Sequence, residues 1–167
     1  MNKQKILEEI HKAEKHLANM KEALKGYKYG KWKPEINETF FYLTGNLKPF
    51  SFKNYGDACS IESLENFNCF QTEEEAKNEA EKILVRRMLE DIAKRLNKGE
   101  KIDWKDTSQE KYFIYLDNEY NKLGYADNIW GKWCQYQGTV YCLDQNFLDV
   151  AIQEIGEGRL IKYLKEG

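Results

Sequence analysis

The chain has 167 residues and a net charge of −2, and 41% of its residues are hydrophobic, 14% aromatic and 32% charged. This composition is typical of a globular protein with a well-solvated surface, and the small net charge argues against extensive phosphate-backbone binding. No apolar run approaches the roughly 20 residues of a membrane-spanning helix, and the Lys- and Glu-rich start lacks the apolar segment of a secretory signal, so we expect a cytoplasmic protein without a membrane partner.

An amphipathic helix is predicted over residues 1–26, as an N-terminal arm. Its apolar residues recur every three or four positions, as in a heptad seam, and they are Ile6, Ile10, Ala13, Leu17, Met20 and Leu24. Gly26 ends the pattern, as glycine commonly does after a helix. Such a short helix either packs on the rest of the chain or pairs with a second subunit as a coiled coil, which would give a homo-oligomer.

The start of the chain is also basic, because residues 1–33 contain nine lysines and four glutamates. The remainder is therefore acidic. A basic arm on an acidic body is compatible with nucleic-acid binding or partner docking. Lysines that only solvate a helix produce the same composition, and we favour that simpler interpretation.

Two similar halves are predicted beyond the arm, about 32–98 and 104–167, and together they form a single domain over 27–167. A shift of 72 residues places Trp32 on Trp104 and the aromatic run 40–43 on 112–115. The same shift aligns helix-spaced apolar residues later in each half. The agreement in order and residue type indicates an internal duplication.

Each half is expected to contain two or three strands followed by a helix. First strands are predicted over 39–44 and 111–117, second strands over 48–52 and 124–130, and short third strands over 68–70 and 139–142.

The helices of the two halves have different start and stop signals. The first begins with the capping box Thr72-x-x-Glu75, continues to Leu96 and is closed by Asn97 and Gly99. The second begins at Asp144, is interrupted over 156–158 and resumes at Arg159. The predicted class is α+β, a pseudo-duplicated ββ(β)α body in which an antiparallel sheet carries the helices on one face.

Catalytic and metal-binding patterns are missing from the sequence. It contains neither G-x-S-x-G nor H-E-x-x-H nor a P-loop, and its two histidines both lie in the N-terminal arm. Cys69 and Cys142 are interpreted as small core residues, whereas Cys59 and Cys134 are placed in loops, and no C-x-x-C pair suggests zinc. We therefore expect no enzymatic activity, no metal and no cofactor.

Aromatic residues in turn-like segments are the main candidates for binding. Tyrosine and tryptophan next to polar groups are common interface anchors, and they also stack on nucleobases. Two adjacent arginines on the long helix either pair with acidic neighbours or hold a phosphate. The candidate binding residues are Tyr55, Tyr120, Tyr125, Trp130, Trp133, Tyr136, Arg86 and Arg87.

Tryptophans have a second interpretation in this chain. Trp130 and Trp133 are equally well explained as side chains that cover an edge of the core. Trp32 and Trp104 each lie eight residues ahead of an aromatic strand, at the same offset in both halves. We therefore interpret Trp32 and Trp104 as packing anchors of their halves.

Three motifs are spread along most of the chain. They are Trp32-x-Pro34 followed by Glu38-x-Phe40, then the segment 68–76 with sequence NCFQTEEEA, and finally the segment 155–160 with sequence IGEGRL. In these motifs and in its helical arm the chain resembles a group of small phage and prophage proteins. The motifs are structural landmarks, so the resemblance assigns no functional residue.

The resemblance implies a phage accessory protein that acts in the host cytoplasm. Small phage proteins of this kind are often counter-defence factors, such as anti-CRISPR proteins. The leading hypothesis is a non-enzymatic protein that binds a CRISPR or other host defence effector protein. One alternative is a sponge that sequesters a nucleotide second messenger of host immunity, and another is a nucleic-acid-binding accessory factor that uses the basic arm.

Overall fold

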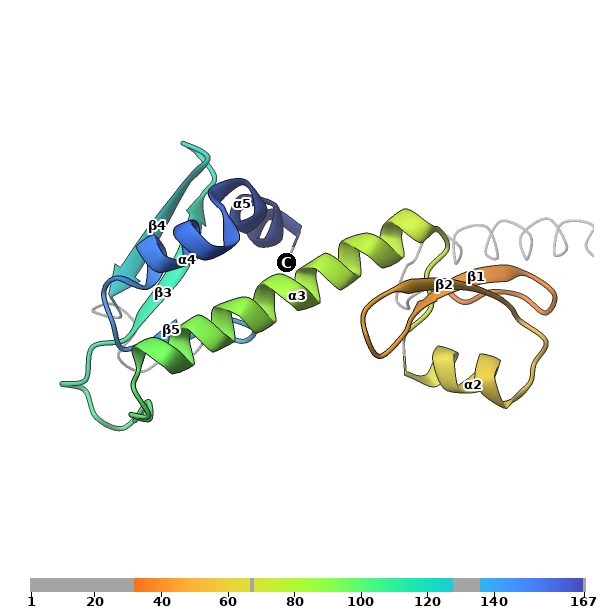
Figure 1. The fold of residues 1–167 in the computed structure, drawn as a ribbon, viewed down its shortest axis with the longest axis horizontal. Helices are drawn as coiled ribbons and strands as arrows, with labels where there is room; N and C mark the ends of the chain where they lie inside the picture. Colours follow the sequence, from red (N-terminus) through yellow and green to blue (C-terminus); the bar gives the residue numbers. More distant parts are fainter. Residues whose placement is uncertain (1–31, 67, 128–135, 167) are drawn as a thin grey trace, which may run out of the picture. The chain divides into compact units, whose positions relative to one another are not determined.

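The structure is a computed structural model, and it describes residues 32–66, 68–127 and 136–166 (Figure 1). The chain divides into two compact units, Met1–Ala76 and Lys77–Gly167. We call them the N-terminal and C-terminal units and describe each by itself. The predicted arm over 1–26 lies outside the described residues. No helix in the described ranges is long and apolar enough to cross a membrane.

The N-terminal unit is built on a β-hairpin. Strands β1 (Thr39–Leu43) and β2 (Pro49–Lys53) pair antiparallel, with Phe40 opposite Phe52. An isolated antiparallel bridge joins Phe41 to Phe70 at the other edge of β1. Phe40 is fully buried, and its ring lies edge-on to Phe52 with 6.0 Å between centroids, so an aromatic pair across the hairpin forms the centre of this unit.

Helix α2 (Ala58–Glu65) follows the hairpin and is not among the predicted elements. Asp57 is its N-cap, and Asp57 Oδ1 accepts hydrogen bonds from the Ser60 amide at 2.9 Å and from the Ser60 hydroxyl at 2.7 Å. The hydrogen bonds from Ser60 lower the pKa of the Asp57 carboxyl. Because this cap satisfies an N-terminal amide of the helix, the eight-residue segment forms about two turns of helix.

The C-terminal unit contains a three-stranded antiparallel sheet of order β4-β3-β5 and three helices. The strands are β3 (Tyr112–Asp117), β4 (Lys122–Asp127) and β5 (Tyr141–Cys142), and the helices are α3 (Glu73–Leu96, whose first residues belong to the N-terminal unit), α4 (Phe147–Ile155) and α5 (Glu157–Glu166). Helices α4 and α5 contact β3, and α5 also contacts β4 (Figure 1).

The core of this unit lies between its helices and one face of the sheet. Val85, Leu89, Ile92 and Ala93 of α3 belong to it, and the other members are Ile114, Cys142, Phe147, Ala151, Ile155 and Leu160. All of these residues are less than about a tenth exposed. The helical repeat of three and four along α3 therefore becomes the stripe that faces the core.

The predicted start and end of α3 are confirmed. Glu75 donates its amide to Thr72 Oγ1 at 3.1 Å, and Glu75 Oε2 accepts from the amides of Gln71 and Thr72 at 2.9 and 3.3 Å. This reciprocal pair is a capping box. After Leu96 the backbone leaves the helix through positive φ angles of 51° at Lys98 and 88° at Gly99.

The second helical segment differs in detail from the prediction. Helix α4 begins at Phe147 with Asn146 as N-cap, two residues after the predicted cap Asp144, whose Oδ1 accepts from the Asn146 amide at 2.8 Å. Gly156, at φ 95°, separates α4 from α5, which resumes at Glu157 rather than at Arg159. Arg159 Nε contacts Glu81 Oε1 of α3 at 2.6 Å.

The α+β class and the antiparallel pairing are confirmed, but the single predicted sheet is wrong for the described residues. There the strands form one two-stranded and one three-stranded sheet, because β1 pairs with β2 and β3 pairs with β4 and β5. The third predicted strand of the first half is only the bridge at Phe70, and β4 begins earlier than predicted, at Lys122. The duplication and the single domain over 27–167 stay predictions.

Candidate functional site

Strand β3 presents two different faces. Ile114 belongs to the helix-covered core, and Tyr112 lies opposite the core residue Cys142. Phe113 and Tyr115 alternate with these residues, so they lie on the other face of the sheet. Phe113 is opposite Tyr141 of β5, which therefore shares that face.

Five aromatic residues gather on this second face, and we call the group the aromatic sheet face: Trp104, Phe113, Tyr115, Tyr136 and Tyr141. The Phe113 ring centroid lies 5.5 Å from Tyr141, 5.8 Å from Tyr136 and 6.4 Å from Tyr115. Trp104 lies edge-on to Tyr141 at 4.9 Å. The rings thus form a contiguous row across β3 and β5.

The row is partly open to solvent. Tyr141 is buried, Phe113 and Trp104 are half-buried, and Tyr115 and Tyr136 are 42% and 55% exposed. The Tyr141 hydroxyl accepts a hydrogen bond from the Tyr136 amide at 2.9 Å, which attaches the segment carrying Tyr136 to the sheet. Two exposed tyrosines therefore pack against rings that are buried or half-buried.

A glycine lets the Tyr115 ring lie against the neighbouring strand. Gly124 is the cross-strand partner of Tyr115 on β4. A Cβ atom at Gly124 would lie only 2.6 Å from Cζ of Tyr115. The ring therefore occupies the space above the glycine, an arrangement that restores the packing a glycine removes from a strand.

A buried lysine supports the edge of the aromatic sheet face. Lys111 is 3% exposed, and its Nζ donates to the carbonyl oxygens of Asp106 and Gln109, both at 2.9 Å. The same ammonium lies 5.8 Å from the Trp104 ring centroid. Two of its N–H groups are hydrogen-bonded and its charge lies close to an aromatic ring, so this side chain ties the backbone at Asp106 and Gln109 to the segment beside Trp104. Trp104 is thus a packing residue, as its repeated offset predicts.

The structure does not bring the predicted binding tyrosines together. Tyr136 joins the aromatic sheet face, but Tyr125 pairs with Ile114 and so points to the opposite face, where it is 53% exposed. Tyr120 lies in the β3–β4 turn and is 66% exposed. Tyr55 belongs to the N-terminal unit. Trp130 and Trp133 lie outside the described residues.

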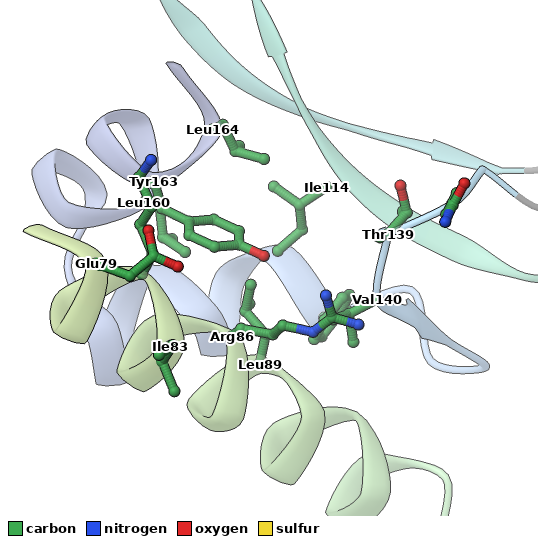
Figure 2. Close-up of a pocket in the computed structure, with 14 residues that line it drawn as sticks. Glu79, Ile83, Arg86, Leu89, Ile114, Thr139, Val140, Leu160, Tyr163 and Leu164 are labelled. Carbon is green, nitrogen blue, oxygen red and sulfur yellow. The ribbon is translucent and has the colours of Figure 1, made fainter. Parts of the chain in front are cut away.

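The C-terminal unit also contains a pocket of about 420 Å³ between α3, α5, β3 and the segment 137–140 (Figure 2). Of the two predicted arginines, Arg86 lines this pocket and Arg87 does not. Apolar side chains from α3, β3, α4 and α5 form most of the wall, and Tyr163, Lys82 and Glu79 add polar groups. The lining residues on the sheet side are Ile114 of β3 and the residues 137–140 that precede β5: Gln137, Gly138, Thr139 and Val140.

The pKa values of two pocket residues are raised. Arg86 Nε donates to Glu90 Oε1 at 2.9 Å, and this hydrogen bond raises the pKa of the guanidinium. Burial raises the pKa of the Tyr163 hydroxyl, against the opposing effect of the positive charge on Arg86. Both groups therefore act as donors near neutral pH: the arginine is a cation and the tyrosine is neutral.

Both buried cysteines are shielded from solvent. Cys69 and Cys142 are buried, as predicted, and burial raises the pKa of the Cys142 thiol. Cys59 is exposed, but it lies in α2 and not in the predicted loop. Among the residues that the structure describes, no group of three or more His, Cys, Asp and Glu side chains is arranged to hold a metal ion.

Sequence reasoning missed most of the aromatic sheet face. Tyr115 and Tyr141 were assigned to strands and given no binding role, although alternation in YFIYLD already separates Phe113 and Tyr115 from Tyr112 and Ile114. That alternation was the available signal. Comparison with models of protein families, with curated proteins and with solved structures found no match.

Proposed function

We propose that this protein is a non-enzymatic, phage-encoded binding protein, and that the aromatic sheet face contacts a host defence effector protein. The observation that carries the proposal is the row of rings in which exposed Tyr115 and Tyr136 rest on half-buried Phe113. The counter-defence role comes from the motif resemblance described above. The contact surface comes from the geometry of β3, β4 and β5.

The aromatic sheet face has the properties of an interface centre. Tyrosine, tryptophan and phenylalanine are enriched in protein interfaces, and a few such residues supply most of the binding energy. Tyr115 and Tyr136 have few rotatable bonds and contact other rings, so they lose little conformational entropy on binding. Their hydroxyl groups offer polar contacts that an aliphatic patch of the same area does not.

Two members of the aromatic sheet face differ between the halves. We propose an internal duplication, and the matching strand order supports it: β1 pairs with β2 and with a later segment at Phe70, as β3 pairs with β4 and β5. The 72-residue shift places Tyr115 on buried Leu43 and Tyr141 on buried Cys69. Tyr115 and Tyr141 therefore have no aromatic counterpart in the first half, which carries its own row of rings at Phe40, Tyr42, Phe50, Phe52 and Tyr55. The registers differ, because Phe41 bridges Phe70 whereas its counterpart Phe113 pairs with Tyr141, one residue before the counterpart of Phe70. An experimental structure in which the two halves have different strand orders would refute the duplication.

The binding function is tested by phage plating on hosts with defined defence systems. Expression of the protein is expected to restore plating on one such host, and the purified protein should form a complex with that system's effector in size-exclusion chromatography. The double substitution Tyr115→Ser with Tyr136→Ser should weaken complex formation about tenfold or more, because it removes two central ring contacts. Tyr120→Ser is the matched control, since this exposed tyrosine lies in a turn.

Three outcomes oppose the proposal in different ways. Failure to restore plating on any host of the panel refutes the counter-defence role. Equal losses from the double variant and from Tyr120→Ser refute the aromatic sheet face as the contact. Recovery of a bound nucleotide in place of a protein favours the nucleotide-sponge alternative.

A further inference from the structure

We propose that the pocket between α3, α5, β3 and the segment 137–140 binds a small organic anion with an apolar body, such as an acyl or aryl carboxylate. This inference goes beyond the proposed protein contact, because the pocket lies on the opposite side of β3 from Phe113 and Tyr115. Its walls and its charged groups come from residues that the aromatic sheet face does not use.

The walls define the apolar body of the ligand. Ile83 and Leu89 of α3, Ile114 of β3, and Leu160 and Leu164 of α5 line the pocket. A volume of about 420 Å³ falls in the range of pockets that hold small organic ligands. Mostly apolar walls favour an acyl chain or an aromatic ring over a sugar or a peptide, because buried polar groups of the ligand would be left without partners.

The positive charges in the pocket wall favour an anionic head group on the ligand. Arg86 extends from α3 toward Thr139 and Val140 across the pocket (Figure 2). Its Nε is used by Glu90, and the guanidinium carries further N–H donors in a planar fork that suits a carboxylate. Lys82 lines the pocket one helical turn before Arg86 and adds a second positive charge.

The one carboxylate in the wall sets the orientation of the ligand. Glu79 precedes Arg86 by seven residues, which places it two helical turns or about 10 Å away along α3. An anionic head therefore belongs at the Arg86 end, beside Thr139, and the apolar body extends away from it. Tyr163 enters the pocket with its hydroxyl toward Ile114 (Figure 2), where it can donate to the head group.

Two fluorescent probes that share the same aromatic rings separate the contribution of charge to binding from that of apolar contact. 1-Anilinonaphthalene-8-sulfonate carries an anionic head, whereas N-phenyl-1-naphthylamine has the same rings without a charge. Both should bind the full-length protein with a fluorescence increase. Arg86→Gln is expected to weaken the sulfonate probe about tenfold and to change the neutral probe by less than about twofold, because only the charged hydrogen bonds are lost.

Matched variants test whether the probes bind in the pocket. Arg87→Gln removes the adjacent, exposed arginine that does not line the pocket, and both probes should bind it as they bind the wild type. Thr139→Trp places a large side chain in the pocket and should reduce binding of both probes. Far-UV and near-UV circular dichroism of each variant shows that the fold is kept, since loosely packed states also bind the sulfonate probe.

Competition then identifies the ligand class. Decanoate is expected to displace the sulfonate probe, and adenosine monophosphate is not. The proposal is overturned if the wild type binds neither probe, if Arg86→Gln and Arg87→Gln have equal effects, or if Thr139→Trp leaves both affinities unchanged. Displacement by adenosine monophosphate at concentrations where decanoate has no effect would also overturn it, in favour of a nucleotide pocket.

Discussion

A single glycine determines where Tyr115 lies, and this is a feature at the scale of one residue. The Tyr115 ring occupies the space that a side chain on Gly124 would take. We predict that Gly124→Ala lowers the free energy of unfolding by up to about 1 kcal/mol, the usual size of a cross-strand side-chain interaction. The obstructing atoms are at the far end of an exposed side chain, so the ring is expected to move rather than the backbone. Urea unfolding measures the change.

A double-mutant cycle checks the cause of that change. In a Tyr115→Ala background no ring lies over Gly124, so Gly124→Ala should then be neutral or slightly stabilising, because alanine suits a strand better than glycine. If Gly124→Ala were equally harmful with and without the ring, the conflict would lie in the backbone instead.

At the scale of the element, the start of α3 depends on the Thr72–Glu75 capping box. Thr72→Ala is predicted to lower the free energy of unfolding by about 1 kcal/mol, since the Glu75 amide loses its acceptor at Thr72 Oγ1. Thr72→Ser keeps a hydroxyl and should restore most of the loss. Thermal unfolding of the three proteins measures this, and an equal effect of alanine and serine would contradict the capping role.

The break between α4 and α5 provides a matched pair of glycines. Gly156 has φ 95°, whereas Gly158 lies in the first turn of α5, where an added Cβ atom would meet no other atom within 4 Å. We predict that Gly156→Ala destabilises the protein by about 1 kcal/mol or more, because an L-residue is strained at positive φ. Gly158→Ala should instead stabilise it by about 0.5–1 kcal/mol, because glycine weakens a helix. Similar effects of the two substitutions in urea unfolding would refute this difference.

How well an element was predicted depends on whether its signal is local. Some sequence signals extend over only a few residues, and the features that they predict are confirmed: the capping box, the aromatic strands and the helix break at Gly156. Helix α2 was missed because its main stabilising contact is the cap at Asp57, within a segment that reads as a turn. The division into two sheets depends on contacts between distant strands, which no local pattern encodes.

The same reasoning explains the partial prediction of the candidate site. Tyr125 and Tyr136 look alike in the sequence, but the pairing of Tyr125 with Ile114 turns it to the helix side of the sheet. Strand register is a property of two segments, so it was not available from either one. Tyr163 was missed because a tyrosine on an amphipathic helix is ordinarily a core residue, and only the packed structure leaves space beside it.

At the scale of the whole molecule, the two compact units predict that the second folds alone. Every residue of the C-terminal core cluster lies between Val85 and Leu160. A fragment over 71–167, which keeps the capping box of α3, is therefore expected to unfold cooperatively in urea, with a smaller m-value than the full chain because less surface is exposed. A fragment without cooperative unfolding, alongside a full chain that has it, would show that the units depend on each other.

Trp104 gives the molecule an optical reporter of its own. The indole lies edge-on to Tyr141 at 4.9 Å and close to the Lys111 ammonium, so its surroundings are asymmetric and charged. The chain has four tryptophans, and a variant that retains only Trp104 would confine indole emission to the aromatic sheet face. Occupation of that surface would then change the emission wavelength and the near-ultraviolet dichroism of an unlabelled protein.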